Sequence, residues 1–282
     1  MTFRLTHILA LLPLIFAVTP LHAQQPPAIT AKSALLLDAN TGRVLYKKNE
    51  EERRPVASTQ KLLTALIVAE TGSLSKNVDI SQGDGDCEPT KLYLKPGQSY
   101  SRSQLLTALL VKSANDVARV LARDNAGSVN RFAERMTQKM RELGGTSSNF
   151  VNPNGLPAQD QYSTARDMAR VARAAYKNDT LREIMKTRSY DFRFSSGKVV
   201  PLRNTNRVLR TYSFCNGMKT GYTELAGHCL ISSGSYKGKD VISVVLGATK
   251  ARCAEESAAL LAYGLDLTPA QMSALRLPGA SE

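Results

Sequence analysis

The sequence predicts an α+β fold of the three-layer α/β type, in which helices flank one antiparallel five-stranded sheet that an all-helical insertion interrupts. Two observations lead to this prediction. Runs typical of strands occur over residues 30–50 and return over residues 185–268, while residues 55–184 between them carry apolar side chains at helical spacing. Helices enclosed between a hairpin at one end of a chain and a meander at the other favour a single sheet with an insertion.

The strands are expected at both ends of the chain. Near the start, residues 34–38 and 43–46 flank the turn-forming group Ala39-Asn40-Thr41-Gly42, which predicts a β-hairpin. Near the end, a closing helix is expected over residues 254–263. Further extended segments are expected over residues 199–202, 216–220, 227–233 and 241–247.

The insertion is predicted to surround one helix that is apolar on nearly every side. Only Thr64 is polar between Leu62 and Ala69. A helix of this kind is buried inside a domain rather than laid on its surface. Pro55 precedes its start, and Gly72 follows its last turn, where a left-handed C-cap belongs. Other helices are expected over residues 103–111, from residue 117, up to residue 143 and from residue 164.

A candidate nucleophile lies in the first turn of this buried helix. Ser58 and Lys61 are three residues apart and share one helix face. A serine hydroxyl becomes reactive when a neighbouring base takes its proton, and desolvation or a second cation lowers the pKa of a lysine towards that role. The helix N-terminus suits an oxyanion. The same S-x-x-K pattern occurs in polar turns at Ser73 and Ser195, so the pattern alone leaves catalysis and packing both open.

Two later motifs favour catalysis. Ser113 and Asn115 form an S-x-N pattern between two predicted helices, where a buried cap is the alternative. Lys219, Thr220 and Gly221 form the chain's only K-T-G, at the end of a predicted strand. On an edge strand a hydroxyl and an ammonium can point at a substrate carboxylate, and a glycine permits close approach. Each pattern is weak alone, but their order and their contexts favour one shared site.

This triple is the signature of penicillin-binding proteins and β-lactamases. The chain resembles the low-molecular-mass penicillin-binding proteins, the serine D-Ala-D-Ala carboxypeptidase family, over roughly residues 30–265. The resemblance implies a β-lactamase/transpeptidase-like fold, a peptidoglycan substrate and no cofactor. Other blocks similar to the family are Pro55 to Thr64, Ser113 to Asp116, Tyr162 to Asp167 and Gly217 to Thr223.

The resemblance implies a catalytic role for four residues. Ser58 attacks the carbonyl of the penultimate D-alanine of a stem peptide and forms an acyl-enzyme, with Lys61 as its base. Ser113 relays a proton to the leaving amine, and Asn115 orients Lys61 and the substrate amide. A β-lactam mimics D-Ala-D-Ala and is therefore expected to acylate Ser58.

A second set of residues is implied to bind substrate. Lys219 and Thr220 hold the terminal carboxylate, and the backbone N–H groups of Ser58 and Tyr222 form the oxyanion hole. Lys219 also helps to depress the pKa of Lys61. The full set comprises Lys219, Thr220, Gly221 and Tyr222.

Three other functions are weighed against the carboxypeptidase. A DD-endopeptidase that cleaves D-Ala-meso-diaminopimelate crosslinks stays open, because residues 202–206 are similar to compact family members with that activity. A class A β-lactamase needs a glutamate after S-x-N, and the nearest, Glu134 and Glu142, are not in an E-x-x-L-N setting. A silent wall-binding protein entails loss of a motif residue, and none is lost.

The first residues are typical of an exported protein. Residues 1–23 read as a signal peptide, with Arg4 before an apolar run from Ile8 to Val18 that is too short to span a membrane. We therefore expect a periplasmic enzyme, soluble or peripheral, cleaved after Ala23 and without a stable membrane anchor. The rest divides into a catalytic domain over residues 24–268 and a short tail over residues 269–282.

Composition narrows the classes further. The formal net charge is +13, but the charges are mixed and no nucleic-acid motif occurs. A basic surface suits anionic polymers, anionic lipid or carboxylate-rich substrates. Beyond the signal, His228 is the only histidine, so we expect no multi-histidine metal site, and a Ser-His-Asp triad would depend on that residue alone. Four cysteines match no zinc pattern, and their pairing is open: Cys87, Cys215, Cys229 and Cys253.

Overall fold

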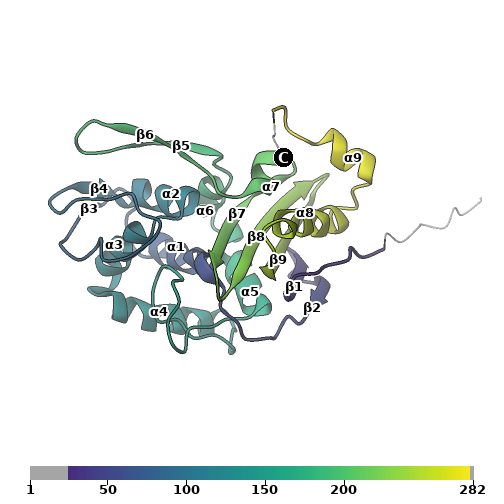
Figure 1. Cartoon of the computed structure of the whole chain (residues 1–282), viewed down its shortest axis with the longest axis horizontal. Helices are drawn as coiled ribbons and strands as arrows, with labels where there is room; N and C mark the ends of the chain where they lie inside the picture. Colours follow the sequence, from purple (N-terminus) through teal and green to yellow (C-terminus); the bar gives the residue numbers. More distant parts are fainter. Residues whose placement is uncertain (1–24, 280–282) are drawn as a thin grey trace, which may run out of the picture.

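A five-stranded antiparallel sheet forms the middle layer of the computed structural model, which describes residues 25–279. The strand order is β2-β1-β9-β8-β7 (Figure 1). The N-terminal hairpin and the C-terminal meander meet where β1 pairs with β9, which confirms the predicted single sheet. The bounds are β1 Ser33–Asp38, β2 Val44–Lys48, β7 Cys215–Thr223, β8 Gly227–Tyr236 and β9 Lys239–Ala248.

Strand β1 shows why the molecule has three layers. Its first five residues are buried, as expected for a strand covered on both faces. Successive side chains point to opposite faces. Leu35 and Leu37 accordingly belong to one hydrophobic core, and Ala34 and Leu36 to the other.

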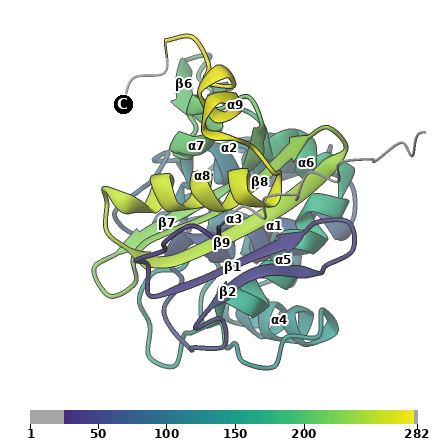
Figure 2. The same ribbon diagram turned by 90° about the vertical axis from the view of Figure 1, so that its right-hand side faces the viewer.

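Each core is closed by a different set of helices. Figure 2 shows α8, Arg252–Gly264, in front of the sheet and the helical insertion behind it. Leu260 and Leu261 of α8 belong to the same core as Ala34 and Leu36 of β1. The insertion comprises α1 Lys61–Glu70, α2 Arg102–Lys112, α3 Asn115–Ala126, α4 Val129–Glu142, α5 Ala165–Lys177 and α6 Asp179–Met185.

Helix α1 is the buried helix that the apolar run predicts. Every residue from Lys61 to Val68 is buried. Gly72, with φ +84°, follows the C-cap as expected. The start differs from the prediction, because Ala57–Gln60 form a 3₁₀ turn, η1, before the α-helix begins. Ser58 therefore lies in η1 and not in α1 itself.

The expected extended segment at residues 199–202 is confirmed as a strand, but its partner strand and several short helices were not predicted from the sequence. Strand β5, Ser189–Arg193, pairs with β6, Val199–Arg203, away from the main sheet, and Phe192 packs against Tyr100 with ring centroids 5.3 Å apart. Strand β5 was missed because it has only five residues and pairs with β6 rather than with a strand of the main sheet. The other short elements are α7 Arg207–Thr211, β3 Asn77–Asp79 and β4 Ser99–Ser101.

Helix α9, Pro269–Ala274, lies in the stretch that was expected to be a tail. A capping box between Thr268 and Gln271 starts it, with proline at the first turn. The chain then returns to α7, because Ser213 donates its backbone N–H to the carbonyl of Leu275 at 2.9 Å. The predicted domain boundary is not tested by this packing, and the predicted signal peptide over residues 1–23 lies outside the described residues.

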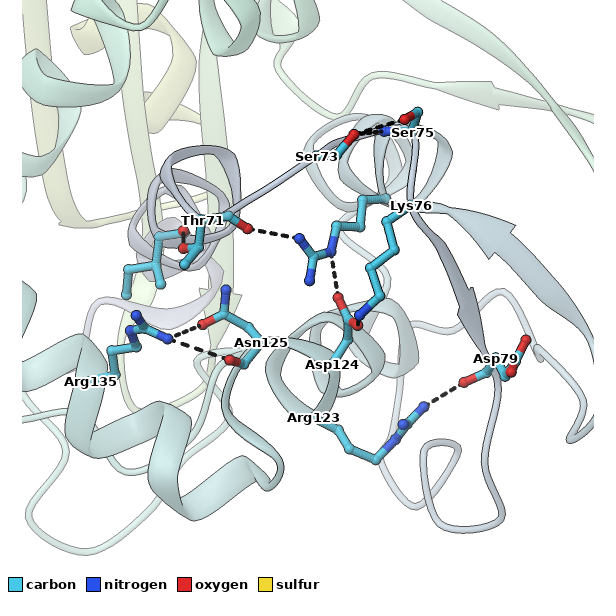
Figure 3. A network of polar contacts seen from close by, with 11 residues as sticks. Thr71, Ser73, Ser75, Lys76, Asp79, Arg123, Asp124, Asn125 and Arg135 are labelled. Atoms are coloured by element: carbon cyan, nitrogen blue, oxygen red, sulfur yellow. Dashed lines mark hydrogen bonds and ion pairs between the residues drawn. The ribbon is translucent and has the colours of Figure 1, made fainter.

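A polar network fixes α3, which carries part of the site, to the ends of α1 and α2 (Figure 3). Asp124 accepts hydrogen bonds from Arg102 at 2.5 Å and Lys76 at 2.7 Å. Arg102 also donates to the carbonyl of Thr71 at 2.7 Å. Within the described residues, none of the helices has both the length and the apolar character needed to cross a membrane.

Candidate active site

Ser58 and Lys61 face each other at the front of the buried helix. Side chains three residues apart eclipse in a 3₁₀ turn, so η1 places Lys61 directly over Ser58. The Nζ atom of Lys61 lies 2.8 Å from the Oγ atom of Ser58. The Ser58 hydroxyl is also 3.2 Å from the backbone carbonyl of Asn154.

Lys61 is enclosed by hydrogen-bond acceptors. Besides Ser58, its Nζ atom contacts Asn115 Oδ1 at 2.7 Å and the carbonyl of Asn154 at 2.5 Å. The side chain is 0% exposed. Desolvation, followed by the charge of Lys219, lowers the pKa of Lys61 well below its ordinary value, whereas Cys87 and Asp116 act in the opposite direction.

This arrangement suits a neutral amine. A neutral amine has two N–H donors and one lone pair, whereas the ammonium has three donors and no acceptor. Asn115 Oδ1 and the Asn154 carbonyl can take the two N–H groups of Lys61. The lone pair is then left for the hydroxyl proton of Ser58, which is the geometry that a general base requires.

The Asn154 carbonyl is the feature that sequence reasoning missed. It belongs to the turn Asn152-Pro153-Asn154-Gly155, whose composition predicts a loop but not what the loop contacts. Gly155 has φ +82°, and a Cβ atom there would lie 2.2 Å from the carbonyl oxygen of Ala57. The turn therefore presses directly on η1, and glycine is required for that approach.

Ser113 and Asn115 lie at the junction of α2 and α3. Ser113 is the C-cap of α2 in the left-handed conformation, with φ +67°. Asn115 is 3% exposed and donates its Nδ2 group to the carbonyl of Glu88 at 3.2 Å. The N-cap of α3 is Ala114, and it makes no side-chain capping bond. Asn115 is therefore not the cap of α3, and its side chain contacts Lys61 instead, whereas Ser113 is the C-cap of α2.

Lys219 connects the sheet to this junction. It lies on β7, an edge strand of the main sheet, and is 1% exposed. Its Nζ atom donates to Ser113 Oγ and to the carbonyl of Thr220, both at 2.8 Å. Burial lowers the pKa of Lys219 to about 7. Lys219 therefore prefers the charged form at neutral pH less strongly than a lysine in water does.

The end of β7 packs against the nucleophile. A Cβ atom at Gly221 would lie 2.7 Å from the backbone nitrogen of Ser58, so only glycine fits. Thr220 shares a hydrogen bond of 2.6 Å with Thr205. Tyr222 follows Gly221, and its exposed ring stacks on His228 with ring centroids 4.3 Å apart. The N–H groups of Ser58 and Tyr222 are the expected oxyanion donors. They belong to residues at or next to the contact between η1 and Gly221 of β7.

Neither the histidine of a Ser-His-Asp triad nor the glutamate of a class A β-lactamase contacts Ser58 among the described residues. The side chain of Ser58 contacts Lys61 and Asn154, and the His228 ring lies against Tyr222. Glu134 and Glu142 are exposed on α4. Within residues 25–279 no group of three histidine, cysteine, aspartate or glutamate residues is placed to hold a metal ion. All four cysteines are free thiols.

The fold and the site together define a serine hydrolase of the acyl-transfer type, with a lysine beside its nucleophile. A family described as D-alanyl-D-alanine carboxypeptidase, peptidase S11, matches residues 20–250. The chain belongs to this family and is a serine-type DD-peptidase, which confirms the resemblance drawn from the motifs.

Curated relatives agree with this assignment. The D-alanyl-D-alanine carboxypeptidase DacF of Bacillus subtilis is 34% identical over 224 residues, which are 78% of this chain and 58% of that protein. The D-alanyl-D-alanine carboxypeptidase of Streptomyces sp. strain K15 is 31% identical over 88% of this chain and 92% of its own length. The D-alanyl-D-alanine endopeptidase of Escherichia coli is 33% identical over 79% of this chain and 73% of its own length.

Solved structures share the fold. The Streptomyces K15 DD-transpeptidase superposes with a TM-score of 0.82 at 29% identity, covering 86% of this chain and 100% of the other. The D-alanyl-D-alanine carboxypeptidase of Mycobacterium tuberculosis also gives 0.82 at 29% identity, covering 89% and 97%. The predicted β-lactamase/transpeptidase-like architecture is confirmed.

Proposed function

We propose that this DD-peptidase removes the terminal D-alanine from peptidoglycan stem peptides through an acyl-enzyme on Ser58. The observation that carries the proposal is the enclosure of Lys61. Two acceptors, Asn115 Oδ1 and the Asn154 carbonyl, occupy its donors and direct its lone pair at Ser58. The Ser58 Oγ atom lies 2.8 Å from the Nζ atom of Lys61, which is 0% exposed, and the backbone nitrogen of Ser58 lies against Gly221 of β7.

Acylation begins when Lys61 takes the Ser58 proton. The Ser58 oxygen then bonds to the carbonyl carbon of the penultimate D-alanine, and the oxyanion accepts hydrogen bonds from the N–H groups of Ser58 and Tyr222. Asn115 holds Lys61 in place. The terminal carboxylate lies against Lys219 and Thr220, which fixes the peptide along the β7 edge.

The leaving group needs a proton when the carbon–nitrogen bond breaks. Ser113 is placed to pass one to the departing D-alanine amine, because Lys219 donates to its hydroxyl oxygen at 2.8 Å and leaves its own O–H free to point at the substrate. The proton that Lys61 took from Ser58 replaces the one that Ser113 gives up, so Lys61 is neutral again. It then deprotonates a water molecule that attacks the ester, and it returns that proton to the Ser58 oxygen as the ester bond breaks. The products are the shortened stem peptide and free Ser58.

A second candidate activity has its own support. The relative named D-alanyl-D-alanine endopeptidase covers most of this chain. In that reaction the leaving amine belongs to meso-diaminopimelate of a neighbouring stem peptide, and every step at Ser58 is the same. β-Lactams are proposed as covalent inhibitors because their strained amide replaces the scissile peptide bond.

We also propose that the enzyme works in the periplasm. The support is the signal-type pattern of residues 1–23 and the location of peptidoglycan outside the inner membrane.

Turnover of a defined stem peptide tests the proposed reaction. A pentapeptide ending in D-Ala-D-Ala should release free D-alanine with the wild type and none with Ser58→Ala. Ser73→Ala is the matched control, since Ser73 begins another S-x-x-K pattern but is exposed and its side chain bonds only to Ser75. D-Alanine release by Ser58→Ala at the wild-type rate would refute the proposal.

A further inference from the structure

Four arginines gather in a cavity beside the active site. The cavity has a volume of about 650 Å³ and lies at the base of the β5–β6 hairpin, between α7 and the chain that follows α9. Figure 2 shows β6, α7 and α9 together at one end of the molecule. We call it the arginine pocket; its lining is Arg188, Ser189, Pro201, Arg203, Arg207, Arg210, Thr211 and Leu277–Gly279.

The charges of the arginine pocket are not balanced by any of the residues that the structure describes. No acidic residue lines it, and none of its four arginines forms an ion pair with a described residue. Some arginines elsewhere form ion pairs, as Arg102 does with Asp124 and Arg166 with Glu50, but Arg119 and Arg173 donate to backbone carbonyls instead. Like charges this close oppose folding, so a cluster without counter-charges indicates a place for an anion.

Arg210 gives a second and independent indication. Its Nε atom is buried, and the described part of the chain offers it no hydrogen-bond partner. A buried donor without a partner is unfavourable, and an anionic ligand would offset that cost. Burial, followed by the charges of Arg203 and Arg207, lowers the pKa of Arg210. The Nε atom of Arg188 donates to the carbonyl of Leu209 at 2.9 Å, so that guanidinium is held against α7.

The arginine pocket is connected to the carboxylate-binding end of the cleft. Arg203 and Thr205 are exposed while Asn204 between them is buried, and two residues of chain span at most about 7 Å. Thr205 is hydrogen-bonded to Thr220, which is proposed to hold the terminal carboxylate. The arginine pocket is therefore two residues of chain away from the residue that contacts the proposed carboxylate-binding Thr220.

The connecting segment is rigid. Asn204 donates its Nδ2 group to the carbonyl of Thr187 at 2.8 Å. Asn206 caps α7 and donates to the carbonyl of Gly217, also at 2.8 Å. The position of Arg203 relative to Thr220 is thus fixed from both sides of the hairpin base.

We propose that the arginine pocket binds a carboxylate of the second stem peptide when the leaving group is a crosslinked peptide. A guanidinium binds a carboxylate through two parallel hydrogen bonds, and several guanidinium groups around one cavity select an anion strongly. Free D-alanine is too short to enter. The pocket thus favours crosslinked substrates on the leaving-group side, and this inference rests on the proposed function of the Ser58 site.

The test measures how one double variant turns over two substrates, a crosslinked muropeptide dimer and a monomeric pentapeptide. In Arg207→Gln/Arg210→Gln, the kcat/KM for a crosslinked muropeptide dimer should fall roughly tenfold or more, mainly through KM, because charged hydrogen bonds are lost. Turnover of the monomeric pentapeptide should stay within about twofold, since a free D-alanine does not reach the pocket. Arg207→Lys/Arg210→Lys keeps the charge and should retain most of the dimer activity.

Controls separate this inference from the proposed function. Arg182→Gln/Arg193→Gln removes two exposed arginines outside the pocket and should leave both substrates unaffected. Wild-type enzyme that fails to react with benzylpenicillin would refute the Ser58 proposal itself. If benzylpenicillin reacts, the pocket proposal is overturned by unchanged dimer kinetics, by equal losses on both substrates, or by a wild type that does not cleave the dimer. It is also overturned if the pocket variant loses binding only to phosphatidylglycerol vesicles, which would indicate a phosphate site.

Discussion

Lys61 and Lys219 show how burial changes the chemistry of a side chain. Both are almost completely removed from solvent, and each contacts a serine hydroxyl of the site. A lysine in water is a cation at neutral pH. The environment that lowers the two pKa values is assembled from η1, the α2–α3 junction and β7, which lie far apart in the sequence.

The pH dependence of acylation follows from Lys61. Its neutral form is the base in the proposed mechanism, so the rate of benzylpenicillin acylation should fall as the pH decreases through the pKa of Lys61. Lys219→Met removes the second cause of the lowered pKa, so the pKa of Lys61 should rise and the acidic limb should move to higher pH. Acylation rates between pH 5 and pH 10 check this. A limb that stays in place or moves to lower pH would contradict the assigned electrostatic coupling.

At the scale of elements, the contact between η1 and the Asn152–Gly155 turn positions the site. The turn supplies the Asn154 carbonyl to both Ser58 and Lys61, and it approaches η1 closely at Gly155. A shift of the turn would remove an acceptor from Lys61 and free the amine to turn away from Ser58.

Gly155→Ala should therefore reduce both stability and acylation. The new Cβ atom would meet the backbone of Ala57 at 2.2 Å, so we expect a loss of about 1–3 kcal/mol in the free energy of unfolding. Gly197→Ala is the control, because Gly197 also has a positive φ, +86°, but no atom lies within 4 Å of a Cβ there. Urea unfolding and benzylpenicillin acylation measure the two effects. Equal behaviour of the two variants would show that close packing at Gly155 is unimportant.

The elements that could be predicted are those with a strong local pattern. The α1 run from Leu62 to Ala69 and the β7–β9 meander are apolar enough to be recognised from sequence alone. The η1 turn and the β5–β6 hairpin are short, and their formation depends on packing against other parts of the chain. The Asn154 carbonyl was out of reach for a different reason, since a backbone oxygen leaves no signature in the side-chain sequence.

At the scale of the whole molecule, the site lies between the two parts of the fold that the sequence distinguishes. Ser58 and Asn115 come from the helical insertion, whereas Lys219 and Gly221 come from the edge of the sheet. The order of the three motifs predicted this meeting without giving its geometry. The arginine pocket lies at the base of the β5–β6 hairpin, and no sequence motif indicates it.

Intact-protein mass spectrometry after addition of benzylpenicillin, followed over hours, tests the central claim most directly. The wild type and Ser73→Ala should carry a lasting penicilloyl adduct, and Ser58→Ala should carry none. An adduct on Ser58→Ala, or no adduct and no penicillin hydrolysis with the wild type, would contradict the assignment of Ser58 as the nucleophile. Rapid hydrolysis without a lasting adduct would contradict the DD-peptidase and identify a β-lactamase.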